Sequence, residues 1–260
     1  MKFVAIIQAR MGSTRLPNKV LMPVLDRPLL GWMLDRVKSC AEIDDVIIAT
    51  TTAIADDVIV QYANSVGVRV YRGSEEDVLD RYYQAACIFE LDAVIRLTAD
   101  CPLIDPRILT EMIQTYKTNE LDFLSNSEPL PSTWPDGMDV SIVSFDALRK
   151  AWEEAVKPSD REHVTFYFWN NPKLFKCERL EHAPDLSNYR LTIDYKEDFD
   201  LLKPIIEHFG VENTASFANI SMGEIITFLD SHPDVFRLNE KYVRGLGWAS
   251  ALEADKKMGL

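Results

Sequence analysis

Long hydrophobic runs are absent from this sequence of 260 residues. No stretch approaches the roughly 18 consecutive apolar residues of a membrane-spanning helix, so we expect neither a membrane segment nor a membrane partner. The first apolar run, Phe3–Ile7, is also shorter than the roughly 7–15 residues that a secretory signal requires. Together these absences predict a cytoplasmic protein.

Cysteine and histidine are scarce, with four residues of each kind. The cysteines have no CxxC spacing, and no histidine stands at ligand spacing from a cysteine or from another histidine. A zinc site is therefore disfavoured, and the cysteines are expected to be reduced and mostly buried.

Basic residues are also few, with 28 Lys and Arg against 41 Asp and Glu, for a formal net charge of −13. Nucleic acid is disfavoured as a partner, because a phosphate backbone attracts basic surfaces. A small anion could still bind where cations gather locally. Such a gathering occurs early in the chain, at Arg10, Arg15 and Lys19.

Short apolar segments alternate with segments of helical periodicity through the first half of the chain. The predicted strands are Phe3–Ile7, Val46–Thr50, Val68–Tyr71 and Ala93–Leu97. The predicted helices are Pro28–Cys40, Asp56–Ser65, one that opens at Ser74, and Pro106–Tyr116. This order predicts an α/β fold of three layers, α/β/α, with a mostly parallel sheet that binds ligands at the carboxyl ends of its strands.

The second half of the chain is less regular. Its predicted strands are Asp139–Ser144, Phe175–Leu180 and Tyr189–Ile193, and its predicted helices are Ala147–Val156, Glu162–Trp169 and Phe199–Phe209. Asp26 and Asp105 are predicted helix caps, and Ser221 with Glu224 forms a capping box. We predict a single domain over 1–260, with an α/β core over about 1–210, an insertion near 122–145 and a helical tail over 211–260.

The cation-rich loop lacks the glycine spacing of a P-loop and of a dinucleotide-binding turn. It does carry Gly12 and Ser13 among its cations, and glycine lets backbone N–H groups approach a ligand closely. Arginine forks match phosphate oxygens, and lysine adds a point charge. The loop is interpreted as a cradle for a triphosphate, against the alternative of a solvated charged loop.

Two aspartates follow predicted strands. Asp100 comes after Ala93–Leu97, and Asp194 ends the segment that begins at Arg190. A carboxylate at a strand end suits Mg²⁺, which prefers one or two carboxylates with phosphate oxygens and water. A turn or cap aspartate is the alternative. Asp198 and Asp200, inside the following helix, are predicted to be solvated.

Six phrases in this order make the sequence similar to the cytidylyltransferase superfamily, which activates acylneuraminate and 3-deoxy-octulosonate sugars. They are QARMGSTRLPNKVLMPV, GSEEDVLDRYY, RLTADCPLID, WPDGMDVSIVS, REHVTFY and RLTIDYKEDF. Within the superfamily the chain most resembles the subgroup of spore coat polysaccharide biosynthesis protein F. The resemblance covers about the first 200 residues and implies a nucleotide-diphospho-sugar transferase-like fold.

The resemblance also implies roles for residues of this chain. Arg10 and Lys19 would hold the phosphates of CTP with Ser13 and Arg15 beside them, and Arg10, Lys19 and Asp100 would be catalytic. Asp100 and Asp194 would bind Mg²⁺. Arg72 and Ser74 fall where the family reads the base. Gln8 and Val20 depart from the sialic acid enzymes, so the acceptor need not be a sialic acid.

The implied reaction is CTP-dependent activation of a small sugar acid to its CMP-sugar with release of pyrophosphate, in the synthesis of a cell-surface or spore-coat polysaccharide. Arg161 could clamp the acceptor's carboxylate beside His163, while Asp136 and Asp139 could bind its hydroxyls. The alternative for 161–163 is an ordinary helix start. A homodimer is expected, because the resembling enzymes are dimers and the segment around Trp134 is too apolar for a free loop.

Three other functions stay open. One is a sugar-phosphate nucleotidylyltransferase that uses another NTP. Another is a metal-dependent glycosyltransferase, although its DxD motif is missing, since TADCP offers one Asp and Asp136 and Asp139 are spaced DxxD. The last is a nucleotide-binding module without turnover.

Overall fold

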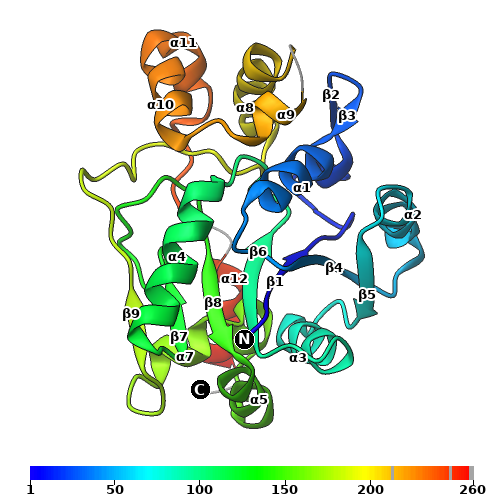
Figure 1. Cartoon of the computed structure of the whole chain (residues 1–260), viewed down its shortest axis with the longest axis vertical. Helices are drawn as coiled ribbons and strands as arrows, with labels where there is room; N and C mark the ends of the chain where they lie inside the picture. The colour runs from blue at the N-terminus through cyan, green and yellow to red at the C-terminus, as the bar shows by residue number, and fades with distance from the viewer. Residues whose placement is uncertain (212–213, 246–247, 258–260) are drawn as a thin grey trace.

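A seven-stranded sheet with the order β5-β4-β1-β6-β8-β7-β9 lies at the centre of the computed structural model, which describes residues 1–211, 214–245 and 248–257 (Figure 1). Its strands are β1 (Phe3–Gln8), β4 (Asp45–Thr51), β5 (Arg69–Gly73), β6 (Ala93–Thr98), β7 (Phe123–Ser125), β8 (Ser141–Ser144) and β9 (Cys177–Arg179). Strands β5, β4, β1 and β6 are parallel, and β8 is antiparallel to both β6 and β7. The predicted, mostly parallel sheet is confirmed.

Helices cover both faces of this sheet. The first helix layer contains α1 (Leu29–Ser39), α2 (Asp57–Ser65), α4 (Pro106–Asn119) and α8 (Lys196–Gly210). The second contains α3 (Val78–Ile88), α5 (Phe145–Glu154), α6 (Pro158–His163) and α7 (Phe166–Asn170). Side chains of β6 alternate between the two cores: Ile95 and Leu97 pack under the first layer and Val94 under the second. The three-layer prediction is thereby confirmed.

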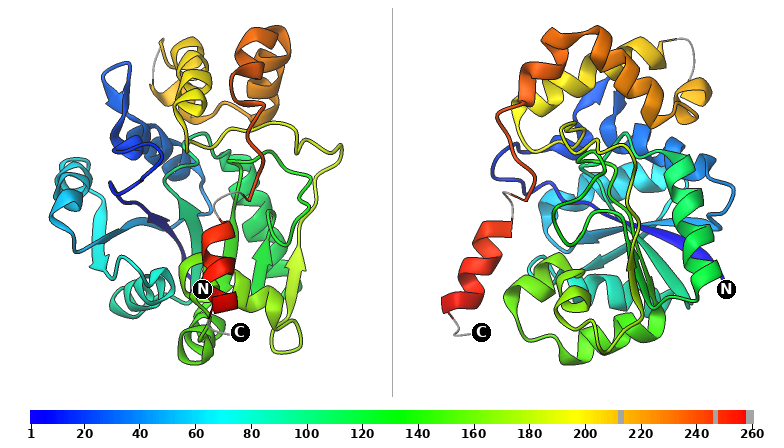
Figure 2. Two further views of the ribbon diagram at one scale, coloured as in Figure 1. Left: turned by 180° about the vertical axis from the view of Figure 1, so that it is seen from behind. Right: turned by 90° about the vertical axis from the view of Figure 1, so that its left-hand side faces the viewer.

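The remaining elements are short. They are the hairpin β2 (Pro23–Val24) and β3 (Arg27–Pro28), then α9 (Thr214–Ala218), α10 (Met222–Ser231), α11 (Pro233–Phe236) and α12 (Ala249–Lys257). Figure 2 (right) shows the chain leaving α11 on the first-layer side and running down past the carboxyl ends of the strands to α12, beside the second layer. Within the described residues, no helix has both the length and the apolar character needed to cross a membrane.

Several local predictions are confirmed. The Asp105 side chain caps α4 by accepting a hydrogen bond from the Arg107 N–H at 2.8 Å. Ser221 and Glu224 form the expected capping box of α10. All four cysteines are free, although only Cys40 and Cys101 are buried.

Other local predictions are wrong for identifiable reasons. Asp26 does not cap α1, because its φ of 60° places it in the turn between β2 and β3. The helix expected at Glu162–Trp169 is broken by Val164, whose φ is 63°, and becomes α6 and α7. Tyr189–Ile193 is not a strand of the sheet, because its backbone pairs with a loop through a single bridge from Arg190 to Asp136.

The insertion near 122–145 supplies β7 and β8 to the sheet. Its Trp134 is 2% exposed, donates a hydrogen bond to the Leu180 carbonyl at 2.8 Å and lies against His182. The apolar character of this segment is therefore explained by packing within the chain.

Candidate active site

A cleft of about 1230 Å³ opens at the carboxyl ends of β1 and β6. Its walls include most of the predicted site residues, namely Arg10, Ser13, Arg15, Lys19, Ser74, Asp100, Asp136, Asp139, Arg161, His163 and Asp194. Gly12 and Arg72 do not line it. Arg72 instead donates hydrogen bonds to the carbonyls of Thr51 and Ala53 at 2.8 and 2.9 Å, so its guanidinium supports the neighbouring loop.

The cation-rich loop is anchored by Asp56, a residue that the sequence had placed only at a helix start. This carboxylate is 2% exposed and accepts hydrogen bonds from the Met11 N–H at 2.7 Å and from Thr50 Oγ1 at 3.1 Å. The Asn18 N–H closes the loop onto the Met11 carbonyl at 3.3 Å. Asp56 therefore fixes the start of the loop relative to the end of β4.

Backbone pairing brings the two predicted metal ligands to the end of the same loop. The Ala99 N–H donates to the Gln8 carbonyl at 2.9 Å, which places Asp100 next to the end of β1. The Ile193 N–H donates to the Asp100 carbonyl at 2.8 Å, which brings Asp194 alongside. The two carboxylates are therefore adjacent as expected, although Asp194 follows an irregular segment and not a strand of the sheet.

Lys19 lies between these two carboxylates. Its Nζ is 3.1 Å from Asp100 Oδ2, 2.9 Å from Asp194 Oδ1 and 2.7 Å from the Ile193 carbonyl oxygen. Burial alone would lower the pKa of this ammonium, but the two carboxylates outweigh burial and raise it. Lys19 is therefore a nearly buried cation held at the centre of the cleft.

Asp194 is also paired with Arg15, whose NH2 atom lies 2.7 Å from Asp194 Oδ1. Burial would raise the pKa of Asp194, but Lys19 and Arg15 together lower it to about 2. Arg10 is more loosely held, with a 3.4 Å contact to Glu75 in which both side chains are about half exposed. Each cation of the loop thus has a carboxylate partner that an anionic ligand could replace.

A buried network supports Asp194 from behind. Asp198, predicted to be solvated, is 0% exposed; its Oδ2 accepts hydrogen bonds from the Asp194 and Tyr195 N–H groups at 2.8 and 2.9 Å. Arg190 links two carboxylates: its Nε donates to Asp198 Oδ1 at 2.9 Å, and its NH1 donates to Asp136 Oδ2 at 2.6 Å. Asp198 is buried because it satisfies both a helix N-terminus and the Arg190 guanidinium.

Gly137 allows this network to form. Its φ is 101°, and a Cβ there would lie 2.4 Å from the Leu191 carbonyl carbon and 2.5 Å from the Thr192 nitrogen. The residues on either side of it, Asp136 and Asp139, were predicted to bind hydroxyls. Asp136 is paired with Arg190, and Asp139 accepts a hydrogen bond from Arg244.

The guanidinium of Arg161 is engaged away from the cleft centre. Its Nε and NH2 donate to Asp77 Oδ2 at 2.9 and 2.5 Å, and its NH1 donates to the Trp152 carbonyl at 2.7 Å. These contacts join α6 to the start of α3 and leave no free fork for a carboxylate. The Arg161 guanidinium is therefore engaged within the chain, and its predicted role as a carboxylate clamp stays a prediction.

The second-layer wall of the cleft holds His163, Glu128 and Arg96. Burial and the nearby Arg96 lower the pKa of His163 to about 4, so its ring is neutral at pH 7. Burial raises the pKa of Glu128, against the opposing effects of Arg96 and a hydrogen bond donated by Thr165. Sequence reasoning missed Arg96 and Glu128, since neither lies at a strand end nor in the cation-rich loop.

Among the described residues, no three His, Cys, Asp or Glu side chains converge as ligands of one metal ion. Asp100 and Asp194 do converge on one cation, the Lys19 ammonium. Two carboxylates fit Mg²⁺, because that ion commonly takes its other ligands from phosphate and water.

Comparison with known proteins agrees with this geometry. Residues 4–219 match the family model described as Cytidylyltransferase. The chain is 36% identical over 239 residues to the spore coat polysaccharide biosynthesis protein SpsF of Bacillus subtilis, across 88% of this chain and 94% of that protein. It is 25% identical over 237 residues to the 8-amino-3,8-dideoxy-manno-octulosonate cytidylyltransferase of Shewanella frigidimarina, across 86% and 81% of the two chains.

A solved structure shows the same fold. A cytidylyltransferase from Leptospira borgpetersenii matches with a TM-score of 0.84 at 37% identity, over 91% of this chain and 97% of that one. The fold implied by the six sequence phrases is thereby confirmed.

Proposed function

This chain belongs to the cytidylyltransferase family, and from that premise we propose that it activates a sugar acid with CTP. A hydroxyl of the acid attacks the α-phosphorus, the bond from that phosphorus to the β-phosphate oxygen breaks, and a CMP-sugar and pyrophosphate form as the hydroxyl proton is released. The observation that carries the proposal is the convergence in one cleft of Arg15 and Lys19 with Asp100 and Asp194.

The names of two relatives support the substrate class and the process. The Shewanella relative is named for an octulosonate, which is a sugar acid, and the Bacillus relative is named for spore coat polysaccharide biosynthesis. We extend both to this chain, as a cytoplasmic enzyme in the synthesis of a cell-surface or spore-coat polysaccharide. We also retain the homodimer, which the resemblance implies.

Transfer of a nucleotidyl group asks the protein for positioning and charge neutralisation more than for covalent chemistry. Arg10, Arg15 and Lys19 would exchange their carboxylate partners for phosphate oxygens, with Ser13 in the same loop as a further donor. Because Lys19 is nearly buried, its charge acts through a less polar medium than a surface lysine's would. Ser74, which lines the cleft, is left to contact the base, since Arg72 does not reach it.

Asp100 and Asp194 would hold Mg²⁺, which when bound neutralises phosphate charge and polarises the phosphorus centre. Asp100 is the more available of the two, because its side chain is 30% exposed and, among the described residues, Lys19 is its one ion-pair partner. Asp194 is held by Arg15, Arg190 and Lys19 as well as by its backbone contact with Asp198. The buried network behind Asp194 keeps that carboxylate oriented.

Pyrophosphate release tests the proposal. The protein is incubated with Mg²⁺, each of the four common NTPs, and a panel of octulosonic and nonulosonic acids together with sugar phosphates. We expect release with CTP and at least one acid. Release with another NTP and a sugar phosphate would support the sugar-phosphate enzyme instead, and CTP binding without release from any acceptor would support a regulatory module.

A further inference from the structure

Arg96 differs from the other arginines of the cleft. Each of the others has a hydrogen bond or ion pair with the chain, whereas Arg96 has neither within the described residues. Its Nε is buried and lacks a hydrogen-bond partner. Its guanidinium lies over the ring of Tyr82, whose centroid is 6.0 Å from Cζ. A charged donor fork is thus held in the cleft without an acceptor.

The strand fixes where this fork lies. Arg96 is paired in the sheet with Ile6 on β1 and Ser141 on β8, and it shares a face of β6 with Val94. Arg96 stands four positions before Asp100, which is at most about 13 Å of extended chain. Arg96 therefore lines the same cleft as the carboxylate pair Asp100 and Asp194.

The groups around Arg96 leave its charge uncompensated by any ion pair. Its electrostatic neighbours include Glu128, a buried carboxyl that accepts no hydrogen bond from it within the described residues, and the neutral ring of His163. The Nε2 atom of His163 is likewise buried without a partner. An unpaired guanidinium in a partly buried site favours an anionic ligand, and one planar fork matches one carboxylate, whereas a phosphate is usually met by several cations.

An outer wall of the cleft that holds Arg96 comes from the C-terminal segment, which we define as Asn239–Gly245 together with Trp248. Asn239 fastens this segment by donating to Asp198 Oδ1 at 2.8 Å, and Arg244 donates to the Trp134 carbonyl at 3.0 Å and to Asp139. Trp248 lines the cleft and packs edge-on against Phe166 at 5.2 Å and His163 at 6.3 Å.

This segment crosses the carboxyl side of the sheet (Figure 2). It lies beyond residues 4–219, the part of the chain that matches the family model.

We propose that Arg96 binds the carboxylate of the acceptor sugar acid, in a subsite that Trp248 of the C-terminal segment closes from the outside. The subsite rests on the proposed function and deepens it, because it explains selection of an acid over a sugar phosphate. It also replaces Arg161, whose fork is already occupied.

The test uses the full chain with CTP, Mg²⁺ and the sugar acid that gives the fastest pyrophosphate release in the panel, which includes 3-deoxy-manno-octulosonate and N-acetylneuraminate. Arg96→Met should raise the KM for the acid by roughly 10- to 100-fold, as loss of a charge-assisted contact implies. The KM for CTP should stay within about twofold. Arg96→Lys, which keeps the charge without the fork, should fall between wild type and Arg96→Met, and Trp248→Ala should raise the KM for the acid several-fold.

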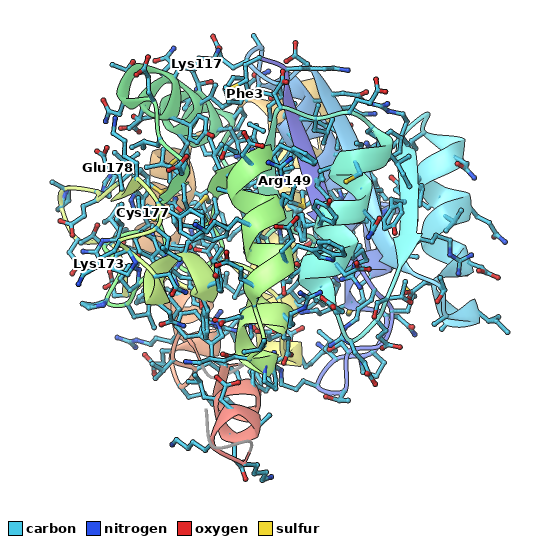
Figure 3. The ribbon with its side chains drawn as sticks, turned by 90° about the horizontal axis from the view of Figure 1, so that it is seen from below. Phe3, Lys117, Arg149, Lys173, Cys177 and Glu178 are labelled. Carbon is cyan, nitrogen blue, oxygen red and sulfur yellow. The ribbon has the colours of Figure 1, made fainter. Side chains whose placement is uncertain are left out.

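The matched control is Arg149→Met. Arg149, labelled in Figure 3, lies on α5 and pairs with Asp146 at the surface. It should change neither KM. Thermal unfolding of each variant shows whether the fold is retained, and the lysine variant decides the matter if the methionine variant is unstable.

Failure of the Arg96 subsite and failure of the proposed function give different results. If an acid supports release but its KM is unchanged in both Arg96 variants, the subsite is wrong and the proposed function stands. If no acid supports release in the wild type, the proposed function is wrong and the subsite falls with it.

Discussion

At the scale of single residues, the Lys19 ammonium has one role inside the chain and a second, proposed role toward CTP, and both use the same positive charge. It neutralises Asp100 and Asp194 inside the chain, and the proposed reaction requires it at the phosphates of CTP. From the sequence alone, Lys19 stands in a loop and is not expected to take part in the buried core. The structure corrects that view, because the side chain is nearly buried between two carboxylates.

Lys19→Met should therefore lower both stability and nucleotide affinity. Leaving two carboxylates without their cation should reduce the free energy of unfolding by about 1–3 kcal/mol. CTP binding should weaken by roughly 1.5–3 kcal/mol, the value of one charge-assisted contact. Urea unfolding and calorimetric titration with CTP measure the two effects.

A second substitution separates the effect of Lys19 on stability from its effect on CTP affinity. Adding Asp194→Asn to Lys19→Met should restore part of the lost stability, because one unpaired carboxylate is removed, but should not restore CTP affinity. An unchanged affinity for CTP in a folded Lys19→Met protein would remove this residue from the phosphate site.

His163 gives the protein a pH dependence of its own. Its folded pKa is about 4, and an unfolded histidine titrates near 6.5. Between those values the unfolded chain binds a proton that the folded chain does not, so the free energy of unfolding should fall as the pH is lowered from about 6.5 to 4. The contribution of this residue should be roughly 3 kcal/mol.

Urea unfolding at several pH values across this window measures the effect. His163→Gln should flatten the dependence, while His208→Gln, on the exposed surface of α8, should leave it as in the wild type. Equal slopes in wild type and His163→Gln would show that this histidine is not buried in its neutral form.

Which arginines of the cleft have partners within the chain could not be predicted from the sequence. Arg161 stands beside a histidine at a helix start and Arg96 stands in a strand, so the pattern favoured Arg161. The difference arises from distant partners, because Asp77 engages the Arg161 fork while no carboxylate of the described residues forms an ion pair with Arg96. Asp100 was predictable because it follows β6 at the carboxyl edge of the parallel sheet, whereas Asp194 follows an irregular segment that the sequence had indicated as a strand.

At the scale of elements, the site depends on an irregular segment packed against a glycine. Residues 190–194 run beside Gly137 through backbone hydrogen bonds, among them Leu191 N–H to the Asp136 carbonyl at 2.6 Å. This close approach places Arg190, Asp136 and Asp194 in one network. The sequence indicated extended backbone here but not its partner, since a loop can satisfy the same donors as a strand.

Gly137→Ala should be strongly destabilising. Its methyl group would overlap the backbone of 191–192, and its positive φ is unfavourable for alanine, so a cost above about 3 kcal/mol is expected. Gly67→Ala is the matched control, because its φ is also positive but no atom lies within 4 Å of the added carbon. The control should lose only about 1–2 kcal/mol.

Thermal or urea unfolding of the two variants compares these costs directly. Equal losses would mean that φ alone, and not the close approach of 191–192, makes glycine necessary at position 137.

At the scale of the whole molecule, the sequence predicted the layers and the parallel sheet well, because buried strands and amphipathic helices alternate through residues 3–119. It predicted the C-terminal segment only as a helical tail. Contacts such as Asn239 with Asp198 and Arg244 with Asp139 join residues more than 40 positions apart, and no local pattern indicates them.

The assembly prediction also belongs to this scale. We expect light scattering at micromolar concentration to give twice the chain mass of 29.7 kDa, since two-fold dimers are the commonest assemblies. Trp134 no longer supports this expectation, because it packs inside the chain. An active monomer under these conditions would contradict the dimer.

The proposed reaction transfers CMP from CTP to a sugar acid. Phosphorus NMR of a reaction containing the full chain, CTP, Mg²⁺ and the preferred acid follows every phosphorus atom at once. We expect a new phosphodiester signal from the CMP-sugar that grows in step with an equal amount of pyrophosphate. Formation of CDP with inorganic phosphate, or of pyrophosphate with free CMP and no phosphodiester, would contradict it.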